Sequence, residues 1–150
     1  MVWNSQLLPL PQLPDLLFPV VLGAAVGGGI NLAWQLSNIF DSPNPPKGFW
    51  ETLERLDFFE LALFTAGGAT IATLPDILEP ATNPNHRALF HSLACGGAVT
   101  YGAFGKHTKN LSPDAKHALR VAALSYLSHL LMDSNTPKGL PVVGLPAINI

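Results

Sequence analysis

The sequence has few charged residues and almost no cysteine. Only 8 Lys and Arg and 10 Asp and Glu occur among its 150 residues, so 12% of the chain is charged. A soluble domain usually has about 25%. The formal net charge of −2, without a run of basic residues, excludes a nucleic-acid-binding module that relies on a basic surface. The single cysteine, Cys95, excludes a disulfide framework and a multi-cysteine zinc ribbon.

Apolar residues are abundant, and one long stretch of the chain carries no charge. They make up 48% of the chain, which excludes an intrinsically disordered protein, because disorder requires low hydrophobicity. Residues 16–40 contain no charge, and this stretch is longer than the ~20 residues that a helix needs to cross a bilayer. We therefore expect contact with membrane lipid and a membrane-associated location, which is the inner membrane in a bacterium. The alternative is a helix buried in a protein core or complex.

Small residues follow one another at helical spacing within this stretch. Small side chains three and four residues apart let another helix approach closely. The face that carries them is therefore a candidate surface for a homo- or hetero-oligomer, although a glycine-rich turn would have the same composition. Its members are Gly23, Ala24, Gly27 and Gly28.

The rest of the chain predicts helices joined by short loops. Four prolines interrupt residues 1–19, so we expect an extended arm there rather than a helix. Apolar residues then recur at steps of three and four, and no period-2 strand pattern occurs. We expect an all-α, up-and-down bundle of about four helical segments, with residues 1–46 as an N-terminal region and 47–150 as the main helical domain. The expected segments cover residues 20–40, 49–74, 86–105 and 113 to 132 or 133.

Acidic and imidazole side chains occur where three of these segments begin or end. In an up-and-down bundle, the end of the second segment, the start of the third and the end of the fourth lie on one side. His129 and Asp133 share a helical face because they are four residues apart. We also expect His91 one turn inside the third segment, close to His86. The candidate metal ligands are Asp76, His86, His91, His129 and Asp133.

This ligand set predicts a hydrolytic metal centre. Imidazole and carboxylate ligands without a thiol suit a divalent cation, zinc first, with manganese or iron as alternatives. A bound cation would activate water and polarise an ester or phosphoester. Arg87 could hold an anionic group of the substrate, and Glu79 is the nearby carboxylate for proton transfer.

Each of these residues also has a simpler interpretation. Asp76 and Asp133 could be ordinary turn residues. His107 and His117 lie in or next to the polar, lysine-containing loop that precedes the last expected segment, and we expect both side chains to be solvated. A serine nucleophile at Ser92 or Ser128 is a minor alternative, since no acidic orienter and no nucleophile-elbow sequence accompanies either serine.

The motifs of the second half resemble those of the YdjM-like family of membrane-bound, metal-dependent hydrolases. The family carries a Pro-Asp element, then His-Arg and His-Ser three residues apart, then His and Asp separated by three residues, followed by Thr-Pro and glycine. The resemblance covers about residues 74–144. The matching residues are Pro75-Asp76, His86-Arg87, His91-Ser92, His129, Asp133, Thr136-Pro137 and Gly139.

The resemblance implies a membrane-associated helical hydrolase with a divalent metal. The family is distantly similar to zinc-dependent phospholipase C and the S1/P1 nucleases, which makes a phosphoester the expected bond. Two family positions differ here: no histidine precedes His86, and Leu78 stands where a second acid is usual, with Glu79 one step later. The alternative function is therefore a non-catalytic structural subunit of a membrane or multiprotein complex, with a degenerate metal site.

Overall fold

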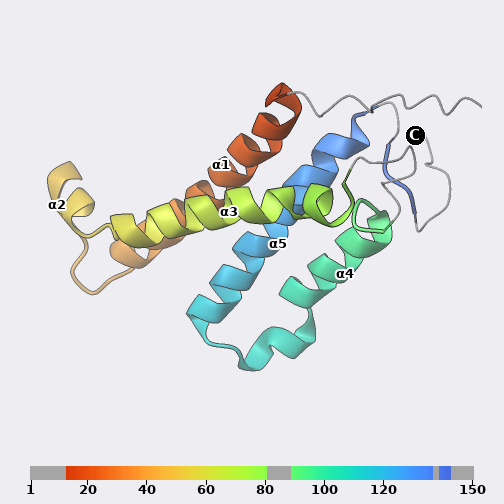
Figure 1. Ribbon diagram of the computed structural model, residues 1–150. Coiled ribbons are helices and arrows are strands. Elements are labelled where there is room, and N and C mark those ends of the chain that lie inside the picture. The colour runs from red at the N-terminus through yellow and green to blue at the C-terminus, as the bar shows by residue number, and fades with distance from the viewer. Residues whose placement is uncertain (1–12, 81–88, 137–138, 143–150) are drawn as a thin grey trace, which may run out of the picture.

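The structure is a computed structural model that describes residues 13–80, 89–136 and 139–142. Over these residues the chain is all-α and contains no strand, as the sequence predicts. The helices labelled in Figure 1 are α1 (Leu13–Phe40), α2 (Phe49–Glu54), α3 (Phe58–Leu78), α4 (Leu93–Phe104) and α5 (Pro113–Ser134). The short 3₁₀ helix η1 (Lys106–Asn110) lies between α4 and α5.

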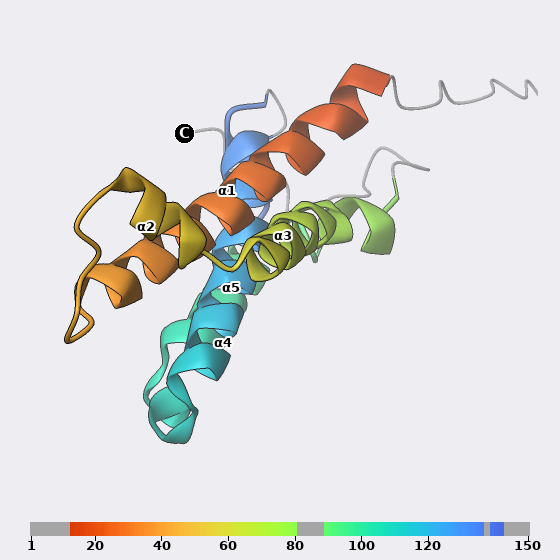
Figure 2. The ribbon, with the colours of Figure 1, turned by 90° about the vertical axis from the view of Figure 1, so that its left-hand side faces the viewer.

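Three long helices form the centre of the bundle. α1, α3 and α5 all pack against one another, and α4 packs on α5. The short helix α2 stands at one end, beyond the point where α1 and α3 cross (Figure 2). The C-terminal ends of α3 and α5 and the start of α4 lie at the other end (Figure 1).

Two prolines expected to lie at helix ends lie inside helices instead. The sequence predicted one helix that begins after Pro19 and another that ends near Pro75. Pro19 lies within α1, which begins at Leu13, and Pro75 lies within α3, which continues to Leu78. The prediction of an extended arm as far as residue 19 is therefore wrong over 13–19. A proline removes one backbone hydrogen bond, which interrupts a helix locally without ending it when the surrounding helix is packed. Both prolines are buried.

The segment expected over 49–74 is two helices, α2 and α3. The chain turns at residues 55–57, where the carboxylate of Asp57 accepts a hydrogen bond of 2.8 Å from the backbone N–H of Glu60 and caps α3. Asp and Glu at this spacing form a helix start signal. Gln35 of α1 fixes the same turn, because it bonds both the N–H and the C=O of Asp57.

Serine caps set the starts of the last two helices. Ser92 accepts from Cys95 N–H, so α4 begins at Leu93, and His91 precedes the helix instead of lying one turn inside it. Ser112 caps α5 from the position predicted, with Pro113 as the first helical residue. The expected polar loop before it forms η1 over most of its length.

The small-residue face of α1 packs closely, and its neighbour is α3 of the same chain. A Cβ built on Gly27 would lie 2.3 Å from the carbonyl oxygen of Phe64 and 3.0 Å from Cα of Gly68. A Cβ on Gly23 would lie 2.4 Å from Cβ of Ala72. The prediction of a close helix approach is thus confirmed. An oligomer through this face stays a prediction, and these glycines are already covered by α3.

A polar cluster that the sequence did not indicate lies between the three central helices. The Nδ2 of Asn31, which is fully buried in α1, donates to Glu60 of α3 at 2.9 Å and lies 3.3 Å from Nε2 of His117. The Nε2 group of Gln35 donates to Asn31 Oδ1 at 2.8 Å. His117 is buried and stacks on Trp34, so the expectation that it is solvated is wrong.

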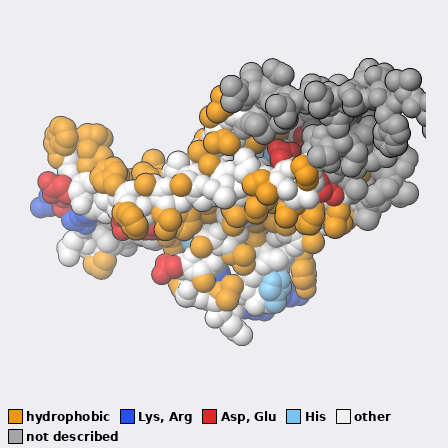
Figure 3. All heavy atoms as spheres, in the orientation of Figure 1, with side chains coloured by type: hydrophobic (Ala, Val, Ile, Leu, Met, Phe, Trp, Pro, Cys, Tyr) orange, Lys and Arg blue, Asp and Glu red, His pale blue; other side chains and the backbone are white. Residues whose placement is uncertain are grey.

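Two helices are long and apolar enough to cross a membrane. They are α1 over Leu17–Phe40, with a mean hydropathy of 1.6, and α3 over Phe58–Leu78, with 1.5. Only 28% of the span in α1 and 17% of the span in α3 is buried in the bundle, and hydrophobic side chains extend along α3 in Figure 3. A helix in the core of a soluble protein would bury most of its surface.

Candidate metal centre

Four of the predicted ligands lie together at the end of the bundle where α3 and α5 finish. Asp76 comes from the last turn of α3, and His91 from the residue before the cap of α4. His129 and Asp133 come from the last two turns of α5. The expected convergence on one bundle end is therefore confirmed for these four residues.

Asp76, His91 and His129 form a group that could hold a metal ion. One ligand atom from each residue lies within 4.8 Å of the other two. Asp133 adds a fourth oxygen, since its Oδ2 lies 3.6 Å from Nε2 of His91 and 3.3 Å from Nε2 of His129. Asp76 Oδ1 lies 3.1 Å and 3.7 Å from the same two nitrogens.

These separations match the spacing of ligands around one small cation. Zinc bonds nitrogen and oxygen ligands at 2.0 to 2.2 Å, which places the ligand atoms of a tetrahedral site about 3.3 to 3.5 Å apart. The four nitrogen-oxygen distances, 3.1, 3.3, 3.6 and 3.7 Å, fall on both sides of that value. The donor atoms therefore need only small shifts to bind one ion.

Glu79 orients His91 from the side opposite to the other ligands. Its Oε2 lies 3.1 Å from Nδ1 of His91, so the ring donates there and presents Nε2 to Asp76 and Asp133. Metal-binding histidines commonly donate the second ring nitrogen to a carboxylate, which fixes the tautomer and the ring orientation. This arrangement is the one that a metal-binding His91 requires.

Glu79 also holds the backbone that carries His91. Its Oε1 accepts from Leu89 N–H at 2.7 Å, and its Oε2 accepts from Phe90 N–H at 2.9 Å and from His91 N–H at 3.3 Å. Burial would raise the pKa of Glu79, but these hydrogen bonds outweigh burial and lower the pKa below its usual 4.5. Glu79 thus positions His91, and the proton-transfer role expected from the sequence stays a prediction.

His129 is buried without hydrogen bonds among the described residues. Neither of its ring nitrogens forms one there, although Nε2 lies close to two carboxylates. Buried polar atoms nearly always have a partner, because an unpaired one costs free energy. A cation bound at Nε2 would provide that partner.

The loop that carries His91 is fixed by three neighbouring parts of the chain. Tyr126 of α5 donates its hydroxyl to the carbonyl of Phe90. Ser92 donates to the carbonyl of Leu89, and Leu93 and Ala94 donate their N–H groups to the carbonyls of Pro141 and Val142. Since Ser92 is engaged with backbone groups on both sides and Ser128 donates to Ser125 C=O, the structure offers no support for a serine nucleophile at either position.

The electrostatics of this end favour a cation. Three carboxylates surround two imidazoles, and the C-terminal ends of α3 and α5, where the helix dipoles are negative, point toward the same place. Burial would lower the pKa of His91, but hydrogen bonds to Asp76 and Glu79 and the charge of Asp133 outweigh burial and raise it above its usual 6.5. The carboxylates therefore stabilise positive charge on His91 when no ion is present.

Two of the predicted site residues lie outside the described part of the chain. These are His86, expected as a ligand, and Arg87, expected as the substrate anchor. Among known proteins, no family model, no curated sequence and no solved structure matches the chain. The resemblance to the YdjM-like family therefore rests on the sequence motifs alone.

Proposed function

We propose that the chain is a membrane-associated, metal-dependent hydrolase of the YdjM-like type that cleaves a phosphoester. One observation supports this most strongly. Nitrogen and oxygen atoms from α3, α5 and the loop before α4 lie 3.1 to 3.7 Å apart around a common point, and Glu79 holds the ring that would contribute one of them. Asp76, His91, His129 and Asp133 would hold the ion.

The chemistry of the donor set fits a divalent cation of intermediate softness. Two imidazoles and two carboxylates suit zinc first, and a pair of histidines with a carboxylate is also used for iron. A cation there would supply Lewis-acid chemistry, polarising the phosphoester and activating water. Glu79 keeps His91 in the tautomer that binds, and the carboxylates of Asp76 and Asp133 offset the charge of the ion.

Membrane association is supported by α1 and α3. Both helices pass the length and hydropathy requirements for a span, and less than a third of either span is buried in the bundle. Asp76 lies near the C-terminal end of α3, so a spanning α3 would place the centre close to one membrane surface. A substrate at the lipid–water boundary could reach it there.

Metal analysis tests the proposal directly. The purified protein should contain about one equivalent of zinc, iron or manganese, and the double variant His91→Ala/His129→Ala should lose it. His107→Ala is the matched control, because His107 is exposed and bonds only a nearby carbonyl among the described residues. Equal, near-zero metal in the wild type and the double variant would contradict the proposal.

The alternative is a structural subunit whose site binds a metal for stability. The engagement of both Glu79 oxygens favours it, because that carboxylate is used for positioning and not for proton transfer. Hydrolysis of a chromogenic phosphodiester separates the two functions. A zinc-loaded protein without hydrolysis above the level of His91→Ala/His129→Ala would favour the structural role.

A further inference from the structure

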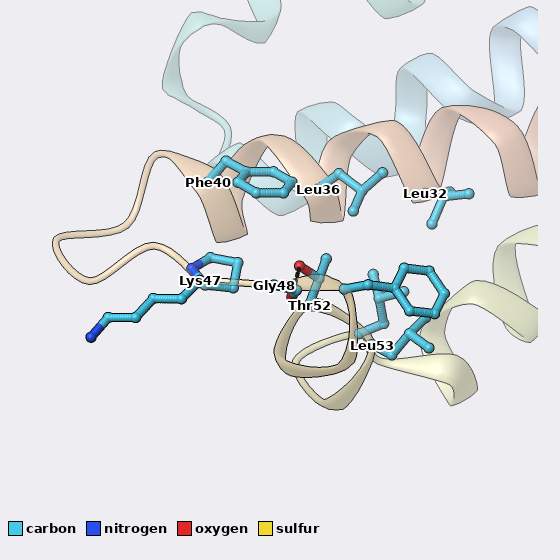
Figure 4. Close-up of a pocket in the computed structure, with 10 residues that line it drawn as sticks. Leu32, Leu36, Phe40, Lys47, Gly48, Thr52 and Leu53 are labelled. Atoms are coloured by element: carbon cyan, nitrogen blue, oxygen red, sulfur yellow. Dashed lines mark hydrogen bonds between the residues drawn. The ribbon is translucent and has the colours of Figure 1, made fainter.

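A second feature lies at the opposite end of the bundle from the metal centre. Between the end of α1 and the short helix α2 runs a groove of about 630 Å³ (Figure 4). Its walls are almost entirely apolar. Leu32, Leu36 and Phe40 line one side, and Phe49, Thr52 and Leu53 line the other.

Polar contacts hold α2 in place, and apolar packing does not. Arg55 pairs with Glu51 at 2.5 Å and donates to the carbonyl of Asn44 at 2.6 Å. Glu51 also accepts from the backbone N–H of Lys47. No residue of α2 is buried. These contacts tie α2 to the loop that precedes it and not to α1, and the groove lies between α2 and α1.

The position of the groove indicates what fills it. The apolar part of α1 ends at Phe40 and that of α3 begins at Phe58, so both candidate spans reach this end of the bundle. Trp50 is 75% exposed and Phe59 is 80% exposed in the same region. Large aromatic side chains are enriched at the membrane–water boundary, where one side is apolar and the other is wet.

We propose that the groove binds one acyl chain of a membrane phospholipid, and that α2 lies in the interfacial layer with Trp50 as its anchor. The bound acyl chain then displaces water from the apolar walls of the groove. The positive charges of Lys47 and Arg55 are balanced by the negative charges of Glu51 and Glu54 in this region. The groove therefore does not require an anionic headgroup, and a zwitterionic phospholipid can bind. This inference rests on the membrane association in the proposed function, but it does not require the metal centre.

Depth-dependent fluorescence quenching tests the position of α2. The full chain is reconstituted in phosphatidylcholine vesicles whose acyl chains are brominated near the headgroup or near the terminal methyl, and the signal of Trp50 is obtained by difference from Trp50→Phe. We expect stronger quenching by the shallow bromines. Protein that co-floats with the vesicles while Trp50 is unquenched at every depth overturns the inference. Protein that does not co-float at all instead contradicts membrane association itself.

A groove-filling variant tests the occupant. Thr52→Phe places a ring in the groove, whereas Thr70→Phe is the control on α3, because Thr70 is exposed and makes the same bond to the carbonyl four residues earlier. Native mass spectrometry should show a retained phospholipid in the wild type and the control, and its loss in Thr52→Phe. Equal retention in all three overturns the groove as the site. A disulfide-linked dimer of Thr52→Cys in a Cys95→Ala background also overturns it, because a second copy would then be the occupant.

Discussion

Glu79 and His91 are joined through both the side chain and the backbone. One carboxylate oxygen, Oε2, lies 3.1 Å from the ring Nδ1 of His91 and 3.3 Å from its backbone nitrogen. The carboxylate thus fixes the rotation of the ring and the path of the chain that carries it. Three predictions concern the metal centre and the groups that support it, and two concern the packing of the central helices.

Glu79→Gln should weaken metal binding without removing any ligand. Outer-shell partners of metal-binding histidines typically contribute 10- to 100-fold in affinity, and a loss of about that size is expected in competition with a chelating dye. Glu54→Gln is the matched control, because Glu54 lies exposed on α2 at the far end of the bundle. Unchanged affinity in Glu79→Gln would show that His91 does not need this carboxylate.

Metal binding should release a proton from His91 near neutral pH. The pKa of His91 is raised above 6.5 despite its burial, because Asp76 and Glu79 bond the ring and Asp133 adds negative charge. An imidazole must be neutral to bind a metal, so affinity should increase as pH rises through that pKa. Calorimetry in buffers of different ionisation enthalpy counts the protons. No release in wild type at pH values close to 6.5 would contradict the prediction.

Without metal, the same shift should make stability fall as pH rises. Protonated His91 stabilises the fold fully below the unfolded pKa of about 6.5, and this contribution is lost as pH rises through the higher folded pKa. The melting temperature of chelator-treated protein should therefore decrease over this range, more than that of His91→Gln. A parallel decrease in both proteins would assign the effect to other groups.

Gly27→Ala should destabilise the crossing of α1 and α3. The added methyl would lie 2.3 Å from the carbonyl oxygen of Phe64, so the helices must separate, at a cost of about 1 to 3 kcal/mol. Gly29→Ala is the control on the same helix, since nothing lies within 4 Å of its new methyl group. It should stabilise by roughly 0.5 to 1 kcal/mol, because alanine favours helix. Denaturation curves that coincide for both variants would be inconsistent with this packing.

Asn31→Leu should also destabilise, because it removes the centre of the buried polar cluster. Glu60, Gln35 and His117 would each lose a bond to Asn31, at about 1 to 3 kcal/mol for a group left unpaired. Asn38→Leu, at an exposed position of the same helix, should change stability little. If the two variants unfold alike, the cluster does not contribute to stability.

Sequence alone predicted the grouping of the candidate metal ligands better than the local geometry around them. Asp76, His129 and Asp133 could be placed because helix ends are signalled by proline, serine and glycine, and because residues four apart share a face. The position of His91 depended on a single cap, and Ser92 moved it from the helix into the loop. Glu79 acts through hydrogen bonds to the backbone of the loop that carries His91. Residue spacing in the sequence does not predict the path of that backbone.

The polar cluster was missed for a different reason. Asn31 lies within a stretch whose composition indicates only burial or a membrane, and its partner His117 is 86 residues away. Nothing local marks such a pair. The sequence did not predict that α3 continues past Pro75. A proline ends a helix reliably only when no packing holds the next turn, and here Pro75 is fully buried.

The bonds from the start of α4 to Pro141 and Val142 have a consequence for biogenesis. Asp76, Glu79 and His91 leave the ribosome long before His129 and Asp133, and the backbone that steadies the loop of His91 is translated later still. The four candidate ligands are therefore all present only after α5 has been translated. An ion bound before that point would be held by at most Asp76 and His91 of these four residues.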